Sequence, residues 1–499
     1  MLSLIVFSPL VAAIFVAALP SEPVAVARRA AFIFSLVPLF LSLLLLAAFD
    51  ANVGALQFVE HASWIPSMGV AYATGVDGFS LWLILLTTFL TPIVLLAAWG
   101  DVHRNVKAYM CLMLVLEGCM LGCLTAIDLI LFFVWFELLL FPMFFLIGIW
   151  GGPNKRYATI KFVLFTMVGS ALMLVSILYL GWRHAAGGPL TFEIAKLYGT
   201  PLSAAEQTWL FAAFALAFLI KVPVIPFHTW LPDAHTEAPT GGSVILAGVM
   251  LKLGTYGFLR IAIPLFPVAA YDAFNLMAVL AVGGILYGAM VALLQPDMKR
   301  LVAYSSVSHL GFIMLGLYAF NNAGVSGSVL QMVNHGLSTG ALFLLVGFVY
   351  ERRHTRMISE FGGLWSVTPV FASLFLVVTL SAVGLPGTNG FVGEFLILIG
   401  AFRANPWAGG LATVGVVLGA VYMLRLYKRV FFGEVSNDEN RKLMDLSGRE
   451  IAVIAPLVLM IFWIGLYPKP FLRRIEPTAK LYLEQIDRNL GASEYAQRD

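Results

Sequence analysis

Long apolar runs separated by short polar connections fill most of this chain. Each run has about 18–25 residues, enough for a helix to span a hydrocarbon core of about 30 Å. The pattern therefore predicts an all-α polytopic membrane protein with about fourteen transmembrane helices. The runs fall near residues 2–19, 30–49, 79–99, 108–124, 128–149, 158–181, 208–223, 243–263, 273–294, 300–319, 325–349, 368–401, 409–432 and 450–467.

The composition agrees with a membrane protein and gives no sign of a cofactor site. Hydrophobic residues make up 60% of the chain and charged residues only 11%, which is outside the range of soluble proteins. The first run lacks a basic flank and a cleavage site, so we expect a retained helix rather than a signal peptide. Cys111, Cys119 and Cys123 form no CxxC or Cys/His ligand set, and no dinucleotide, P-loop or Fe–S spacing occurs. We expect no cofactor, metal or redox centre in this chain.

Basic residues lie mostly in alternate connections, which predicts the orientation. The opposite connections hold only Arg183, Lys196, Arg260 and Arg403. Both termini should then lie on the trans side, which is the periplasm if the chain sits in a bacterial inner membrane. The tail (Lys469, Arg473 and Arg474) departs from this pattern, but late charges weigh less. The basic set comprises Arg28, Arg29, Arg104, Lys107, Lys155, Arg156, Lys299, Arg300, Arg352, Arg353, Arg356, Arg425, Lys428, Arg429, Arg441, Lys442 and Arg449.

The stretch 218–260 joins two apolar helices through a polar break. Lys221 lies near the end of the first helix, Pro223 and Pro226 interrupt it, and the second helix carries Lys252. An ionised group inside a bilayer is costly and is functional by default. Freed backbone is tolerated at that depth only where protein buries it or where it lines a wet cavity. The stretch therefore predicts part of an ion path.

A second break, around Pro386 in GLPGTNG, interrupts the run 368–401. Five spans separate the two breaks, so a five-helix repeat would place its second copy upside down in the membrane. Paired breaks in inverted repeats point to a transport site near the midplane. We therefore expect two inverted five-helix repeats, each with one broken helix. The predicted division is 1–107 as an N-terminal three-helix segment, 108–263 and 273–432 as the two repeats, and 450–499 as the last span and a polar tail.

The ionisable residues inside the spans suit proton relay. A carboxylate stabilises the charged form of a buried lysine, so moving the two changes which one holds the proton. Imidazoles exchange protons near neutral pH, and neighbouring hydroxyls and amides can hold ordered water. The stripe Gln331, Asn334, His335, Ser338 and Thr339 should thus face a hydrated interior. The predicted relay residues are Glu137, Lys221, Lys252, His309, His335 and Glu394, with supporting roles for Glu117, His228, Pro223, Pro386, Gln331, Asn334 and Ser338.

Each of these residues also has a purely structural interpretation. A buried ion can pair helices, Glu117 suits pairing as well as relay, and the stripe around His335 can join helices without forming a path. His228 and His235, which follow the first break, are better explained as groups that order the loop than as zinc ligands. They lack a third matched ligand. A membrane spacer without transport would not need so many buried ionisable groups.

Several motifs together resemble one known family. KVPVIPFHTWLPDAHTEAPTGGSVILAGVMLKLGTYG resembles the core of the antiporter-like membrane subunits of respiratory NADH:quinone oxidoreductase, complex I. FFVWFELLLFPMFFLIGIWGG, PDMKRLVAYSSVSHLGF, VNHGLSTGALFLLVG and LPGTNGFVGEFLILIG resemble the subunit M group of that family. The resemblance covers most of residues 70–400. It implies a proton-translocating subunit with a hydrated polar axis, flavin, Fe–S clusters and quinone in partner subunits, and L-like and N-like subunits on either side.

The resemblance also assigns roles by motif. Glu137 is then the acid of the first unit, Lys221 the lysine of its broken helix, and Lys252 the connecting lysine. His309 and His335 continue the axis to Glu394, the acid of the second broken helix. Subunits L and N resemble one another in having lysine at this last position. The alternative function is a subunit of a multi-subunit sodium/proton antiporter, which Glu394 and the context of Glu137 make less favoured.

The first prediction concerns Glu137 and Lys221. Glu137→Gln or Lys221→Ala should leave assembly intact and remove proton pumping and most coupled quinone reduction, because each change removes one group of the pair that exchanges the proton. NADH-driven acidification of vesicles that contain assembled protein measures this. Normal acidification by either assembled variant would contradict the assignment.

Overall fold

The computed structural model describes residues 1–435 and 437–496 of the chain, and helices dominate it. The first part contains α1 (Leu2–Ala18), α2 (Val24–Ala48), β1 (Gln57–Ile65), β2 (Val70–Val76), α3 (Ser80–Asp101), α4 (Val106–Thr125), α5 (Leu129–Leu138), α6 (Leu140–Trp150), α7 (Lys155–Ala185), α8 (Ile194–Leu197), α9 (Ala204–Lys221) and α10 (Trp230–Glu237). One continuous rod follows, made of α11 (Thr240–Ile245), η2 (Leu246–Met250), α12 (Lys252–Gly257), η3 (Phe258–Ala262) and α13 (Ile263–Leu265).

The second part has the same character. It contains α14 (Pro267–Asp272), α15 (Phe274–Leu293), α16 (Met298–Leu317), α17 (Asn322–Arg353), α18 (Leu364–Val367), α19 (Pro369–Val383), α20 (Asn389–Ala404), α21 (Pro406–Phe431), α22 (Asp438–Arg441), α23 (Gly448–Leu466) and α24 (Lys469–Ala496). Among the described residues, twelve helices are long and apolar enough to cross a membrane, and α1 and α19 are shorter apolar helices. Together they correspond to the fourteen predicted runs, so the helical polytopic class is confirmed.

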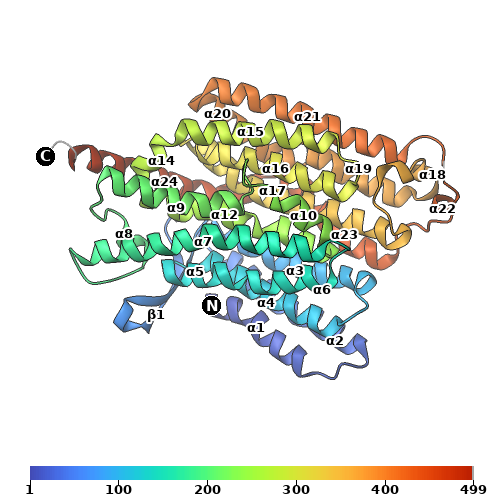
Figure 1. The fold of residues 1–499 in the computed structure, drawn as a ribbon, viewed down its shortest axis with the longest axis horizontal. Helices are drawn as coiled ribbons and strands as arrows, with labels where there is room; N and C mark the ends of the chain where they lie inside the picture. Colours follow the sequence, from blue (N-terminus) through green and yellow to red (C-terminus); the bar gives the residue numbers. More distant parts are fainter. Residues whose placement is uncertain (436, 497–499) are drawn as a thin grey trace.

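The long helices lie side by side, and their connections gather at two ends of the molecule (Figure 1). At one end Arg28 donates to the carbonyl of Val102, Lys107 to that of Leu19, and Arg356 to that of Thr236. We call this end, with the connections 19–23, 102–105, 151–154, 294–297 and 354–363, the basic end. The opposite end, which holds the hairpin β1–β2, is the hairpin end. The alternate basic connections predicted from the sequence thus meet at one end.

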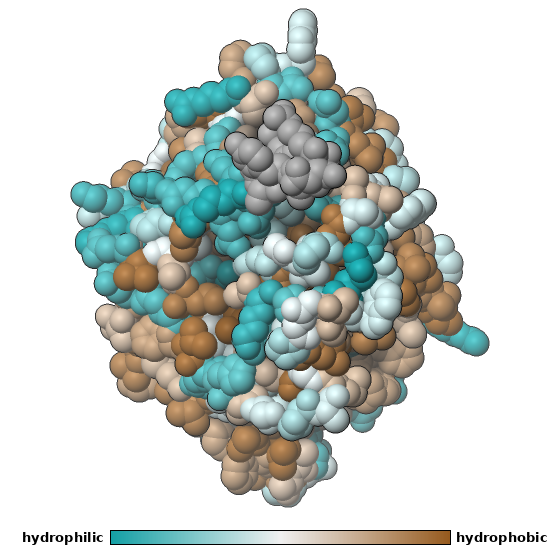
Figure 2. All heavy atoms as spheres, turned by 90° about the vertical axis from the view of Figure 1, so that its left-hand side faces the viewer, coloured by the Kyte–Doolittle hydropathy of each residue, from teal (hydrophilic) through white to brown (hydrophobic). Residues whose placement is uncertain are grey.

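The hairpin end contains two elements that the run pattern did not predict. β1 and β2 form an antiparallel hairpin, and Glu60 on β1 pairs with the amino group of Met1. The helix α24 follows the last span and buries Phe471, Ile475 and Tyr482 against the bundle. Figure 2 looks onto this end and shows polar residues over much of its face.

Both predicted helix breaks are present. α9 ends at Lys221, and the chain becomes helical again only at Trp230, because Pro223 and Pro226 cannot donate the backbone hydrogen bonds of a continuing helix. α19 ends at Gly384, whose φ of +78° is a left-handed conformation that a residue with a Cβ rarely adopts. The inverted-repeat relation between the two halves remains a prediction.

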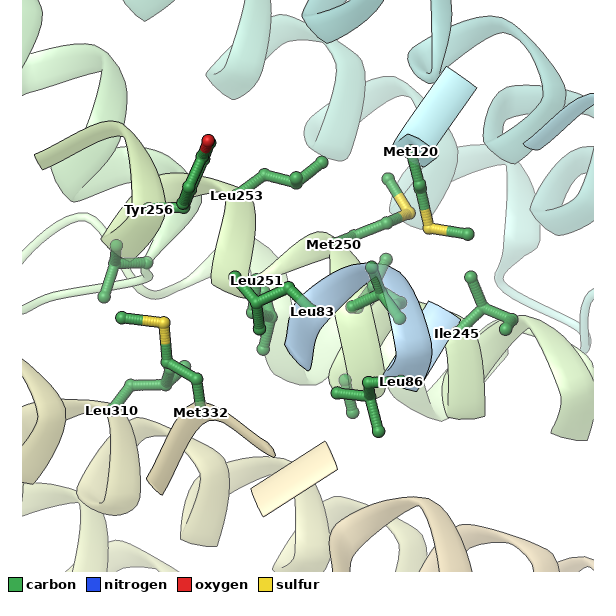
Figure 3. Packing of buried hydrophobic residues seen from close by; sticks show 14 of the residues in the cluster. Leu83, Leu86, Met120, Ile245, Met250, Leu251, Leu253, Tyr256, Leu310 and Met332 are labelled. Atoms are coloured by element: carbon green, nitrogen blue, oxygen red, sulfur yellow. The ribbon is translucent and has the colours of Figure 1, made fainter. Parts of the chain in front are cut away.

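An apolar core encloses the rod that carries Lys252. Leu83 and Leu86 of α3, Met120 of α4 and Met332 of α17 pack around Leu251 and its neighbours (Figure 3). The rod contains two π-helical turns, η2 and η3, on either side of α12. α17 is buried from Gly324 to Val349, so none of its faces meets lipid. The lysine therefore lies in the interior of the molecule.

One buried ion pair at the hairpin end joins η3 to the segment between β2 and α3. Arg260 on η3 lies 2.5 Å from the carboxylate of Asp77, and their side chains are only 13% and 3% exposed. The guanidinium Nε also donates to the hydroxyl of Tyr256 at 3.2 Å. Since an unpaired charge at such depth is costly, each partner makes the other's burial tolerable.

The second prediction concerns this pair. Asp77→Ala should lower the stability of the purified protein by about 3–5 kcal/mol, because it leaves the Arg260 guanidinium buried without its carboxylate. The midpoint of thermal denaturation in mild detergent measures the loss. Lys442→Ala is the matched control, since it breaks the exposed Lys442–Glu439 pair and should leave the midpoint unchanged. Equal midpoints for Asp77→Ala and the control would contradict a stabilising role.

Candidate functional site

A buried amine in direct contact with an imidazole forms the centre of the site. The Nζ of Lys252 lies 2.6 Å from Nδ1 of His335 and donates to the carbonyl of Ala247. Lys252 is fully buried. Ala247 lies in the π-helical turn η2, where the backbone departs from α-helical pairing, and such turns are frequent at functional sites. The lysine can thus pass a proton to His335 without an intervening group.

Two imidazoles and a carboxylate continue from this contact. The rings of His335 and His309 meet edge to face, with centroids 5.7 Å apart. Nδ1 of His309 lies 3.0 Å from Oε1 of Glu394, and both side chains are nearly buried. The four groups come from four separate segments, α12, α17, α16 and α20. The structure therefore brings Lys252, His335, His309 and Glu394 into one buried row, which we call the relay row.

The polar stripe of α17 supports the carboxylate end of the relay row. Nε2 of Gln331 donates to Oε1 of Glu394 at 3.1 Å, and Nδ2 of Asn334 donates to Oε1 of Gln331 at 3.2 Å. Asn334 also donates to the carbonyl of Asn389, at the start of α20, at 2.7 Å. These bonds fix Glu394 relative to the second helix break.

A small cavity lies along the relay row. It is lined by His309, His335, Glu394, Ser338 and neighbours, and leaves about 10 Å³ for the centre of a water molecule, room for about one water. Ser338 shares a hydrogen bond of 2.6 Å with Ser381 beside it. The cavity lies beside the polar stripe, and the hydrated interior there remains a prediction.

Glu137 and Lys221 do not meet directly. Within the described residues, the Nζ of Lys221 has no hydrogen-bond partner, and it lies 4.8 Å from the ring centre of Phe136. Such contacts stabilise a cation by about 0.5–2 kcal/mol. Glu137 is half-buried, and one of its carboxylate oxygens is likewise without a partner. The two charges interact only over a longer distance.

Lys221 nevertheless packs close to the rod that carries Lys252. A Cβ built on Gly254 would lie 3.0 Å from the Cβ of Lys221, and one built on Gly257 would clash with the ring of Phe218. The two glycines thus allow α9 to approach α12 closely. Lys221 and Lys252 thus lie on two adjacent, closely packed helices.

Other predicted residues lie apart from the relay row. Glu117 on α4 is fully buried, and neither of its oxygens has a hydrogen-bond partner within the described residues. His228 lies in the first break, with its ring 5.1 Å from that of Tyr287. Pro223 and Pro386 lie in the two breaks, where they end helices rather than contact the relay row.

Several buried polar residues escaped the sequence analysis. Asp77 lies just before α3, Asn389 begins α20, and Ser381 precedes the second break. From the sequence, His235 is expected only to order the loop after the first break, and Lys299 only to set the orientation of the chain in the membrane. Asn389 lies within the GLPGTNG break, which could have pointed to it, whereas nothing in the sequence indicated that Asp77 meets Arg260. Among the described residues, no group of three His, Cys, Asp or Glu side chains is placed to hold a metal ion.

The helical bundle, its two breaks and the buried relay row define a membrane subunit of the antiporter type. Residues 126–419 match the family model described as the NADH:quinone oxidoreductase/Mrp antiporter transmembrane family. A curated relative from Rhodobacter capsulatus, NADH-quinone oxidoreductase subunit M, is 45% identical over 503 residues, which cover 98% of each chain. This chain belongs to the subunit M family of NADH-quinone oxidoreductase.

Solved structures support this assignment. A chain of respiratory complex I from Thermus thermophilus with bound NADH has a TM-score of 0.89 at 34% identity and covers 97% of this chain and 100% of that one. A chain of the Mrp complex from Dietzia sp. DQ12-45-1b has a TM-score of 0.82 at 22% identity, covering 100% of this chain and 56% of that one. The second likeness shows a shared fold alone.

The third prediction concerns Glu394. Glu394→Gln keeps an oxygen for the donors of Gln331 and His309 but cannot bind and release a proton, so it should abolish pumping. Glu394→Asp keeps a titratable carboxyl and should retain substantial pumping. Glu394→Lys should fail, because its amine would face the Gln331 amide donor instead of accepting from it.

NADH-driven acidification of sealed vesicles, normalised to assembled complex, separates these variants. If Glu394 served only to hold α20 in place, Glu394→Gln would pump as well as the wild type.

Proposed function

We propose that this chain translocates protons as a membrane subunit of a redox-driven NADH:quinone oxidoreductase. The observation that carries the proposal is the relay row, in which an amine, two imidazoles and a carboxylate follow one another inside an apolar bundle. Each of these groups can bind one proton and release it. Buried ionisable groups of this kind mark ion paths in membrane proteins.

The contacts suggest how a proton moves along the relay row. Lys252 and His335 are 2.6 Å apart, so both are not positively charged at once, because like charges at that distance repel strongly. A proton on one of them excludes a proton on the other. When His309 takes the proton from His335, Glu394 balances the new charge at 3.0 Å. The hydrogen bonds at the two ends of the row, and the room for about one water beside the histidines, would then replace bulk water.

The subunit's surroundings follow from the same proposal. The chain supplies no redox chemistry of its own, and partner subunits hold the flavin, Fe–S clusters and quinone. L-like and N-like membrane subunits would lie on either side. The gathered arginines and lysines favour the basic end as the cytoplasmic end of a bacterial inner membrane, with both chain termini periplasmic. The Glu137–Lys221 pair would then sense charge near the first break, because their interaction changes with distance.

A sodium/proton antiporter subunit is the other candidate function, since the Mrp likeness shows the same fold. The carboxylate at position 394 and the level of identity to subunit M of R. capsulatus favour the first candidate. Purification in mild detergent separates the two, because flavin- and Fe–S-bearing partners should accompany this chain only if it belongs to the oxidoreductase.

The fourth prediction tests the relay row itself. Lys252→Met should lower NADH-driven proton pumping by about tenfold or more, because a thioether of similar length cannot carry a proton. Acidification of inverted membrane vesicles, normalised to assembled complex, measures the effect. Lys196→Met at the exposed hairpin end is the matched control and should pump normally. Undiminished pumping by Lys252→Met would contradict the proposal.

A further inference from the structure

The basic end contains a polar cavity that the relay row does not include. Its volume is about 180 Å³, and it is lined by residues of α3, α10, α16 and α17 and their connections. The charged residues in its wall are Asp101, Glu237, Lys299 and Arg356. We call it the basic-end cavity.

Lys299 is the most deeply placed cation in this wall. It is 6% exposed, and its Nζ donates to the carbonyl of Ala238 at 2.5 Å. Ala238 follows the last residue of α10, where the helix dipole favours a positive charge. Arg356 also donates to this helix end, at the carbonyl of Thr236. Two cations, Lys299 and Arg356, therefore donate to carbonyls at the C-terminal end of α10.

His235 lies on α10 one helical turn before Ala238, whose carbonyl accepts from Lys299. Its ring is fully buried and stacks on Phe343, with centroids 4.7 Å apart. Within the described residues, neither ring nitrogen has a hydrogen-bond partner. The two charged groups that act on the ring electrostatically are Lys299 and Lys252. A buried imidazole whose nitrogens lack hydrogen-bond partners costs stability unless water binds them.

We propose that Lys299 takes up protons from the basic-end cavity and that His235 passes them to Lys252. This inference rests on the proposed function and adds the uptake route to it. A proton from cavity water forms an N–H bond on the neutral amine of Lys299. The ammonium then releases a proton to one nitrogen of His235, which releases a proton from its other nitrogen to Lys252. Only N–H and O–H bonds form and break, and Lys299 ends neutral and ready for the next proton.

The order of these steps follows from charge. Lys299 and Lys252 both act on His235, so it accepts a proton from Lys299 only when Lys252 is neutral, since like charges disfavour a further positive charge. Lys252 becomes neutral when its proton moves to His335 and onward. Uptake would thus wait for transport along the relay row.

The competing explanation is that Lys299 merely caps α10. Lys299→Arg separates the two, because arginine keeps the charge and the donors of a cap but does not release its proton in proteins. We expect assembled Lys299→Arg and Lys299→Met both to pump about tenfold less than the wild type. Arg300→Met, which removes the neighbouring exposed cation, is the matched control and should pump normally. Normal pumping by Lys299→Arg would leave a capping role only and overturn the inference.

Chemical restoration gives a second test that does not depend on the size of arginine. Lys299→Cys should pump poorly, and 2-aminoethyl methanethiosulfonate added at the cytoplasmic face of inverted vesicles should restore pumping, because it rebuilds a primary amine of similar length. The trimethylammonium reagent supplies a permanent charge without a proton and should not restore it. Restoration by both reagents, or failure of the introduced thiol to react from the cytoplasmic face, would overturn the inference.

His235→Phe completes the set. Phenylalanine can keep the stacking on Phe343 but has no nitrogen, so pumping should fall as in Lys299→Arg. If Lys252→Met pumps normally, the proposed function itself fails. If Lys252→Met loses pumping while Lys299→Arg and His235→Phe retain it, only the uptake route fails.

Discussion

The contact between the Lys252 amine and the His335 imidazole is the interaction on which the arrangement of the bundle depends. An ammonium inside an apolar core has lost its hydration and must find other partners. Lys252 finds them in the Ala247 carbonyl and the His335 ring. Both partners require unusual local structure. The carbonyl lies in a π-helical turn, and the imidazole lies on a helix enclosed by protein along most of its length.

That requirement explains the position of α17. A helix carrying Gln331, Asn334, His335 and Ser338 cannot face lipid, because each polar side chain there would lack a partner. α20 and α16 cover this stripe and supply Asn389, Glu394 and His309 in return. The second helix break contributes as well, since the start of α20 leaves the Asn389 carbonyl where Asn334 can reach it. The hydrogen bonds among these residues favour one packing of α16, α17 and α20.

The sequence predicts the elements better than it predicts their contacts. The apolar runs, both proline-marked breaks, the alternate basic connections and the stripe on α17 could all be predicted, because each depends on neighbouring residues along the chain. The meeting of His309 with Glu394 could not, since the two lie 85 residues apart on separate helices. The same holds for Arg260 and Asp77. The family resemblance supplied the roles of Lys252, His335 and Glu394, but not the hydrogen bonds that join them.

Two features of the sequence indicate local structure beyond the apolar runs. In α24, Phe471, Ile475, Ala479, Tyr482 and Ile486 recur at helical spacing and are all buried, which marks an amphipathic helix rather than a polar tail. Lys299 was counted for topology alone, although its place at the start of an apolar run already put it near the membrane. The sequence pairs Glu137 with Lys221, but within the described residues the amine has no hydrogen-bond partner and lies 4.8 Å from the ring centre of Phe136.

Ionisable groups interact differently in the relay row and at the first helix break. In the relay row, hydrogen bonds join Lys252 to His335 and His309 to Glu394, and the rings of the two histidines meet edge to face between these pairs. At the first break, Lys221 lies against Phe136 and interacts with Glu137 only at longer range. A Coulomb interaction without a hydrogen bond changes smoothly with separation, whereas a hydrogen bond is lost within a fraction of an ångström. α9 ends at Lys221, just before Pro223. A small shift of α9 would therefore move the Lys221 charge relative to Gly254 and the nearby Lys252. Under the proposed relay, the region of the first break would sense displacement and the relay row would move protons, and the close packing of α9 on α12 joins the two.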